Sequence, residues 1–163
     1  MLSKETMWGE PLLQSLFRKV EWAGKELNVP EWIIEEEIKK FKKKEITNEK
    51  IRVELDDGTY KSFTGTVVLH CNPYTSREDP YKGGLRITDQ VTPSLLRVLA
   101  FEMTFKEGVV DLRFGGGKSG IRLHRPVMTY SKRELHKIVE EFATEFIRDD
   151  DIINPHYYVP ATD

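Results

Sequence analysis

The sequence predicts one α/β domain built in three layers, in which a short mixed β-sheet has helices on both faces and a helical pair stands at the N-terminus. Its 163 residues and 39% hydrophobic content suffice for one core and are too few for two ordinary domains. A β-rich run is followed by two apolar helical patterns, and such helices bury their apolar faces on a sheet. No Rossmann domain is expected within these residues.

The N-terminal segment carries two helical patterns. Apolar residues recur at helical spacing in its first half and again after Pro30, a residue type favoured in the first turn of a helix. We therefore expect residues 1–45 to be a helical segment packed on the rest of a single domain spanning residues 1–163. The two apolar faces consist of Leu13, Phe17, Val20 and Leu27, and of Ile34, Ile38 and Phe41.

Residues 51–69 have the pattern of a β-hairpin. Apolar and polar residues alternate from Ile51 to Leu55, and a second β-rich run continues through Val67. Between the two runs, Asp57 and Gly58 are the residue pair typical of a type I′ turn. We expect two antiparallel strands joined at this turn.

Capping signals predict two further helices. Thr92 and Pro93 suit the N-cap and first position of a helix that runs to about Glu107, with apolar residues on most of its sides. Ser131 and Glu134 form a capping box that precedes an apolar stripe at helical spacing. The first helix should be buried, and the second should lie against the core along its stripe.

Composition excludes several classes of function. Lys and Arg number 25 against 27 for Asp and Glu, so the net charge of −2 gives no reason to expect nucleic acid or an anionic membrane as partner. No apolar run suits a signal peptide or the roughly 20 residues of a membrane span, which favours a cytoplasmic protein. Cys71 is the only cysteine, so an internal disulfide and a cysteine-based zinc cage are excluded, and no metal site is expected.

Two segments place a lysine beside consecutive glycines: residues 80–86, PYKGGLR, and residues 114–120, FGGGKSG. We interpret both as glycine-rich turns, where the absence of a Cβ lets a ligand approach the backbone N–H groups. Lys106 lies between them on the buried helix, where an ammonium group needs a partner or a cavity. Together Lys82, Lys106 and Lys118 predict a site for an anion.

These segments also allow other interpretations. Lys106 could extend from the helix end into solvent, and Lys118 could belong to a structural ion pair. A Walker loop is excluded because the position five residues before Gly117 is Leu112. A formal GxGxxG match precedes an extended segment and not a helix, so no cofactor-binding residues are predicted. The match is formed by Gly115, Gly117 and Gly120.

Four blocks of sequence, PYKGGLR, LAFEMTFK, FGGGKSG and VPATD, give the chain a family resemblance. In their order and spacing, from about residue 51 to residue 163, the sequence resembles the N-terminal substrate-binding and oligomerisation domain of the Glu/Leu/Phe/Val dehydrogenases. The resemblance is greatest to glutamate dehydrogenase. Residues 1–50 match only in being helical.

The resemblance implies a role for each matching residue. Lys82 would contact the side-chain carboxylate of glutamate or 2-oxoglutarate, and Lys106 the α-carboxylate. Leucine-type members have an apolar residue at the position of Lys82, so this lysine implies a dicarboxylate substrate. Lys118 would be the catalytic lysine that activates water and stabilises the carbinolamine. The residues that would shape the pocket around these contacts are Gly83, Gly84 and Met103.

The sequence departs from the family pattern in two respects. Tyr158 stands where the family has an aspartate that acts as general acid and base, and a tyrosine of ordinary pKa is a poor base at pH 7. His156 could take over the proton transfer, although a lone histidine is more often structural. The family continues beyond the position of Asp163 into a Rossmann domain that binds NAD or NADP. We therefore expect no dehydrogenase activity from this chain alone.

The residues and the resemblance leave two functions open. The chain is expected to be the substrate-binding and oligomerisation part of a glutamate dehydrogenase-like oxidoreductase, either truncated or split before the NAD(P) domain. The alternative is a non-catalytic regulatory or assembly subunit that binds glutamate or 2-oxoglutarate, which Tyr158 favours. In both cases the resemblance implies a homo-oligomer, and in the first a separate NAD(P)-binding chain is a possible partner. The stretch 72–79 is longer than in most of the family.

Overall fold

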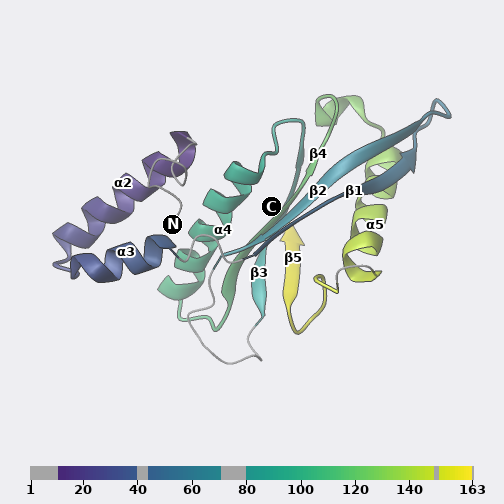
Figure 1. Ribbon diagram of the computed structural model, residues 1–163. Helices are drawn as coiled ribbons and strands as arrows, with labels where there is room; N and C mark the ends of the chain where they lie inside the picture. The colour runs from purple at the N-terminus through teal and green to yellow at the C-terminus, as the bar shows by residue number, and fades with distance from the viewer. Residues whose placement is uncertain (1–10, 40–43, 71–79, 149–150, 163) are drawn as a thin grey trace.

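The computed structural model describes residues 11–39, 44–70, 80–148 and 151–162, which form a five-stranded mixed sheet with helices on both sides (Figure 1). The strand order is β1-β2-β4-β3-β5, antiparallel between β1, β2 and β4 and parallel between β4, β3 and β5. The strands are β1 (Lys44–Glu54), β2 (Tyr60–Leu69), β3 (Tyr81–Thr88), β4 (Gly115–Arg122) and β5 (Tyr158–Thr162). The helices are α2 (Pro11–Glu26), α3 (Glu31–Lys39), α4 (Pro93–Val109) and α5 (Lys132–Arg148), with a 3₁₀ turn, η2 (Val127–Thr129).

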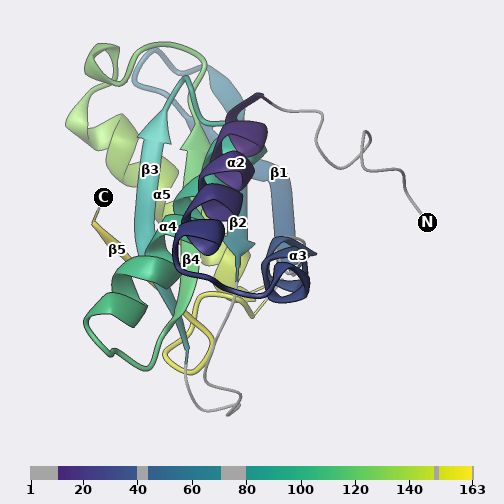
Figure 2. The same cartoon turned by 90° about the vertical axis from the view of Figure 1, so that its left-hand side faces the viewer.

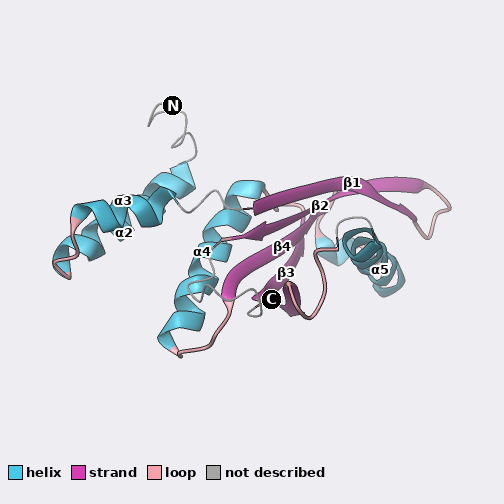
Figure 3. Cartoon of the chain, turned by 60° about the horizontal axis from the view of Figure 1, so that its bottom comes forward, coloured by secondary structure: helices cyan, strands magenta, loops and turns pink. Residues whose placement is uncertain are grey.

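The helices occupy layers on the two faces of the sheet, as Figure 3 shows in a view along the layers. Helix α5 covers one face, where the largest apolar cluster includes Phe63, Ile121, Phe142 and Phe146. Helix α4 covers the other face, and the α2–α3 pair lies outside α4 (Figure 2). The predicted α/β fold with helices on both faces is therefore confirmed.

The predicted helical pair is present in the described residues, but the expectation that the segment is helical as far as residue 45 was wrong, because α3 ends at Lys39 and Lys44 begins β1. Leu13 and Phe17 of α2 and Ile34 of α3 are buried in a cluster that also contains Val98 and Phe101 of α4. The assignment of Leu27 to this buried face was wrong, because α2 ends at Glu26 and the Leu27 side chain is 75% exposed. Phe41, also assigned to an apolar face, lies outside the described residues, as do Cys71 and the stretch 72–79.

The hairpin of β1 and β2 is confirmed, but its turn is not of type I′. A type I′ turn needs positive φ at both central residues, whereas only Gly58 has one, at 80°. The Gly58 N–H donates to the carbonyl of Leu55, and Asp57 Oδ1 accepts hydrogen bonds from the N–H and the hydroxyl of Thr59 at 2.9 and 2.7 Å. The geometry is that of a longer turn that ends in a left-handed glycine, held by the Asp57 carboxylate.

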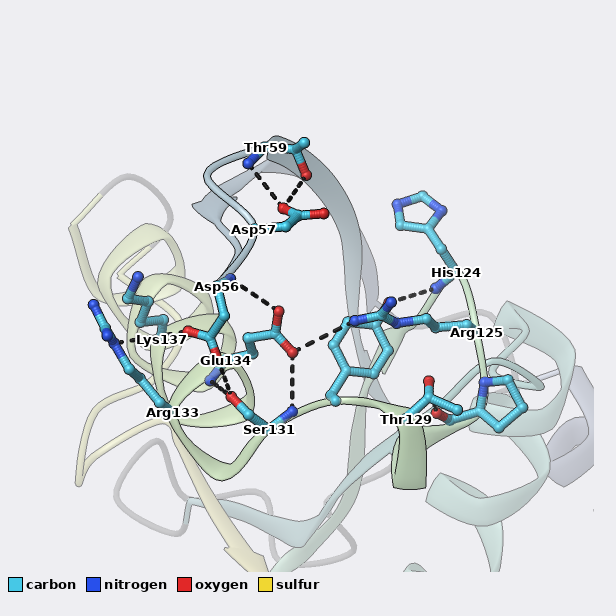
Figure 4. Close-up of polar contacts among 12 residues, drawn as sticks. Asp56, Asp57, Thr59, His124, Arg125, Thr129, Ser131, Arg133, Glu134 and Lys137 are labelled. Carbon is cyan, nitrogen blue, oxygen red and sulfur yellow. Dashed lines mark hydrogen bonds and ion pairs between the residues drawn. The ribbon is translucent and has the colours of Figure 1, made fainter.

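Both predicted helix starts are confirmed. Thr92 is the N-cap of α4, where its hydroxyl accepts the N–H of Leu95 at 3.2 Å. The Ser131–Glu134 capping box of α5 is closed in both directions, at 2.9 and 3.1 Å. Glu134 also accepts the N–H of Asp56 at 3.0 Å (Figure 4), which attaches the start of α5 to the hairpin turn.

The prediction that PYKGGLR and FGGGKSG are turns was wrong. Residues 81–86 belong to β3 and residues 115–120 to β4, and the two strands are parallel neighbours. Alternation along β4 directs Gly116, Lys118 and Gly120 toward α4, and Gly117 and Ser119 toward α5. These glycines allow neighbouring elements to approach closely. The sequence alone does not distinguish such a glycine from one in a turn.

Candidate functional site

A cleft of about 300 Å³ lies between α4 and the strands β3, β4 and β5. All six residues predicted to bind substrate or act on it line this one cleft, including the three lysines. Residues from four elements contribute to its walls. The lining consists of Lys82, Gly83, Gly84 and Arg86 of β3; Leu99, Glu102, Met103 and Lys106 of α4; Lys118 of β4; and Ala161 and Thr162 of β5.

Strand register positions the lysines of the sheet. Lys82 pairs with Gly116 of β4 on one side and with Val159 of β5 on the other, in the middle of the parallel half of the sheet. Lys118 pairs with Val68, which packs toward α4. Side chains two residues apart on a strand share a face, so Lys118 points to the side of the sheet that α4 covers. It is only 4% exposed.

Helix α4 supplies the opposite wall. Leu99, Glu102, Met103 and Lys106 recur at spacings of three and four residues, which places them on one helical face toward the cleft. The helix lies close to the sheet because Gly116 has no side chain. A Cβ at this position would stand 2.2 Å from Thr104 Oγ1 and 2.3 Å from the carbonyl oxygen of Ala100.

The charge of the cleft is predominantly positive. Four cationic side chains line it, against the single carboxylate of Glu102. The Lys106 Nζ lies 3.8 Å from Glu102 Oε2, and the two side chains are 67% and 46% exposed. Lys118 is buried at the base of the cleft. A small dianion is the complementary ligand, because it can meet an exposed ammonium group at the mouth and a buried one below.

Tyr158 does not face this cleft. Its side chain is fully buried in the apolar cluster on the α5 side of the sheet. Its hydroxyl donates to Ser119 Oγ at 2.9 Å, and its ring covers Gly117, where a Cβ would stand 2.7 Å from Cε2. The side chain at position 158 therefore belongs to the core and not to the cleft.

His156 is exposed and does not line the cleft. Its backbone N–H donates to Asn154 Oδ1 at 2.9 Å in the turn before β5. Asp163 lies outside the described residues. The position of His156 therefore does not support its use as a replacement base in the cleft.

Several lining residues were given no binding or catalytic role from the sequence. Arg86 shares a strand face with Lys82 four residues earlier, and Glu102 lies one helical turn before Lys106. Both spacings were available as signals once the neighbouring lysine had been selected. Ala161 and Thr162 carry no chemical signal, and only the pairing of β5 with β3 brings them to the cleft.

The formal GxGxxG match does not form a dinucleotide cradle. Gly115, Gly117 and Gly120 lie within β4, and the space a pyrophosphate would need beside Gly117 and Gly120 is filled by Tyr158 and Leu96. No helix begins directly after the strand, so no helix N-terminus faces these glycines. Among the described residues, no group of three His, Cys, Asp or Glu side chains could hold a metal ion.

The model of one protein family, the Glu/Leu/Phe/Val dehydrogenase dimerisation domain, matches residues 43–163. The chain belongs to this family. The resemblance inferred from the four sequence blocks is therefore confirmed, and the matched range contains the sheet, α4, α5 and the whole cleft.

Several similar proteins are glutamate dehydrogenases. The NAD-specific glutamate dehydrogenase A of Halobacterium salinarum is 36% identical over 156 residues, which is 94% of this chain and 33% of that protein. The glutamate dehydrogenase of Thermotoga maritima is 38% identical over 111 residues, 68% of this chain and 24% of that protein. This glutamate dehydrogenase-like chain thus spans a third or less of the length of these relatives.

Solved structures agree with the sequence relatives. Glutamate dehydrogenase from Peptoniphilus asaccharolyticus superposes with a TM-score of 0.74 at 29% identity, over 93% of this chain and 35% of that one. The hetero-hexameric glutamate dehydrogenase of Thermus thermophilus, in its Leu-bound form, gives a TM-score of 0.71 at 26% identity, over 100% of this chain and 35% of that one.

In the described residues of the present chain, none of the helices has the length and apolar character that crossing a membrane requires.

Proposed function

We propose that the chain is the substrate-binding and assembly part of a glutamate dehydrogenase-like oxidoreductase, which converts L-glutamate to 2-oxoglutarate by oxidative deamination. One observation carries the proposal: Lys82, Lys106 and Lys118 line a single cleft of about 300 Å³. A cleft of this size suits a small ligand, and converging cations suit one with two carboxylates.

Each lysine has a proposed task. Lys82 on β3 binds the side-chain carboxylate of the diacid, and Lys106 on α4 binds the α-carboxylate. Lys118 is the catalytic lysine that activates water and stabilises the carbinolamine, a task that its burial supports because its charge acts more strongly where bulk solvent does not screen it. Gly83, Gly84 and Met103 shape the walls between these contacts.

Hydride transfer needs a nicotinamide cofactor held against the substrate, and the glycines of the GxGxxG match form no cradle for one. We propose that these 163 residues bind the diacid without turning it over, and that NAD or NADP is held by a further domain, in the same or a separate polypeptide. Glutamate-dependent formation of NADH or NADPH by the purified 163-residue chain would contradict this.

Calorimetric titration with 2-oxoglutarate tests the binding site. We expect saturable binding by the wild-type chain and a loss of at least about tenfold in affinity for Lys82→Ala, because a charged hydrogen bond contributes roughly 1.5–3 kcal/mol. Lys61→Ala is the matched control, since Lys61 is an exposed lysine outside the cleft, and its affinity should be unchanged. Equal affinity in all three proteins, or no binding by any, would refute the site.

A non-catalytic regulatory or assembly subunit is the second candidate. It is favoured by Tyr158, whose side chain lies in the core and cannot exchange protons with a ligand in the cleft. A separately produced nucleotide-binding domain of a relative distinguishes the two: turnover by the mixture indicates a split enzyme, and binding without turnover indicates a regulatory subunit. Either function predicts a homo-oligomer, so a monomer in analytical ultracentrifugation would count against both.

A further inference from the structure

We infer that Glu102 is an affinity-limiting residue of the cleft, whose carboxylate interacts with Lys106 until a carboxylate of the ligand displaces it. This inference rests on the proposed function, because it concerns the same cleft and the same class of ligand. The four cations of the cleft strengthen the binding of a dianion, whereas Glu102 weakens it.

The geometry places Glu102 where it competes with a ligand. Glu102 and Lys106 lie one turn apart on α4, and both line the cleft. The distance of 3.8 Å between Glu102 Oε2 and Lys106 Nζ is at the upper limit of an ion pair. Glu102 is also the only acidic residue among the described residues that line the cleft.

Exposure makes this ion pair easy to displace. The side chains are 46% exposed for Glu102 and 67% for Lys106, and an exposed pair at i and i+4 stabilises a helix only slightly. Glu preceding Lys is the favourable order for such a pair, so Glu102 orients Lys106 toward the cleft. The interaction is weak, so a ligand can take the place of Glu102. A ligand carboxylate that also contacts Lys82 has a second attachment and can replace Glu102.

Repulsion adds to the competition. A bound dianion places a carboxylate within a few ångströms of Glu102, and like charges at that separation repel even in water. Glu102 therefore weakens binding twice, by occupying Lys106 and by repelling the ligand. The expected benefit is faster release of a diacid from a cleft whose four cations would otherwise retain it.

Glu102→Gln tests the inference, because glutamine keeps the size and helix propensity of the side chain and removes its charge. In calorimetric titration at low salt we expect Glu102→Gln to bind 2-oxoglutarate about three- to tenfold more tightly than wild type. Glu140→Gln is the matched control: Glu140 is exposed on α5, across the sheet from the cleft, and its affinity should stay at the wild-type value.

A double-mutant cycle tests whether Glu102 acts through Lys106. In a Lys106→Ala background, the tightening caused by Glu102→Gln should shrink to about twofold or less, because only the direct repulsion remains. Unchanged or weaker binding by Glu102→Gln, with wild-type protein still binding, would overturn this inference and leave the proposed function intact. Absence of binding by wild type, Glu102→Gln and Glu140→Gln alike would overturn both.

Discussion

The Tyr158 hydroxyl donates a hydrogen bond to Ser119 Oγ at 2.9 Å on the face of the sheet opposite the cleft. Ser119 follows Lys118 in β4, and the two side chains point to opposite faces of the sheet. Lys118 faces the cleft, and Ser119 faces the core beneath α5. Tyr158 belongs to β5, and β3 lies between these two strands. The tyrosine thus ties together the three strands that carry Lys82, Lys118 and the β5 wall of the cleft.

Removing the Tyr158 hydroxyl should destabilise the protein. Tyr158→Phe keeps the ring over Gly117 but leaves Ser119 without this donor, so we expect a loss of about 1 kcal/mol in the free energy of unfolding. Urea denaturation followed by circular dichroism measures it. Tyr60→Phe is the matched control, because the Tyr60 side chain is 59% exposed, and it should change little. Equal losses in both variants would contradict the buried bond.

An aspartate at position 158, the residue that the family resemblance implies there, should destabilise the protein and give no turnover. Tyr158→Asp would bury a carboxylate in the apolar cluster beneath α5 and leave the volume of the ring unfilled. We expect a loss of more than about 3 kcal/mol in the free energy of unfolding, seen as a large fall in the midpoint of thermal denaturation. A stable Tyr158→Asp variant that gains turnover with an added nucleotide domain would show that β5 can rotate this side chain into the cleft.

The close approach of α4 to β4 should make Gly116 intolerant of substitution. A methyl group there meets Thr104 and the carbonyl of Ala100 at less than 2.5 Å, so Gly116→Ala should destabilise the protein by about 1–3 kcal/mol and weaken ligand binding. Gly108 lies in α4, and a Cβ added there would have no atom within 4 Å. Gly108→Ala should therefore be neutral or stabilising, by up to about 1 kcal/mol. Thermal denaturation should show a lower melting temperature for Gly116→Ala and an unchanged or higher one for Gly108→Ala.

Glu134 should contribute more to stability than an exposed glutamate of the same helix. Its carboxylate is buried and accepts the N–H groups of Asp56 and Ser131, with Arg125 3.5 Å away (Figure 4). Glu134→Ala leaves two backbone donors without their acceptor, so we expect a loss of about 2–3 kcal/mol in chemical denaturation. Glu140→Ala should cost less than about 0.5 kcal/mol, and a similar loss in both would argue against the buried contacts.

Asp57 should make the hairpin turn sensitive to acid. Hydrogen bonds from the hydroxyl and the N–H of Thr59 hold the pKa of the Asp57 carboxyl below its ordinary value of 3.8. A lowered folded-state pKa stabilises the fold above the unfolded pKa, and that contribution disappears as the pH falls through the folded value. Wild type should therefore exceed Asp57→Asn in stability at pH 7, and the difference should shrink as the pH falls below the ordinary carboxyl pKa of 3.8. A difference that is constant from pH 7 to pH 2.5 would contradict this.

Local signals in the sequence predicted the helices and their starts. Thr92 and the Ser131–Glu134 pair act through hydrogen bonds to residues three positions away, so their geometry follows from the sequence alone. Lys82 and Lys118 were found through an unusual charge beside glycines and Lys106 through its place on a helix predicted to be buried, and all three line one cleft. Leu27 and the type I′ turn were mistaken because neither periodicity nor a residue pair fixes where a helix ends or which φ a residue adopts.

The sequence by itself determined the layers of the fold, the capped helices and the identity of the cations, because each depends on periodicity or on contacts a few residues apart. Only the tertiary structure decided which face each strand residue occupies. Parallel pairing of β3 with β4 and β5 brings Lys82 and Lys118 to the α4 side and sends Tyr158 to the α5 side. A shift of one residue in a strand reverses its faces, so this division depends on register, which long-range pairing sets.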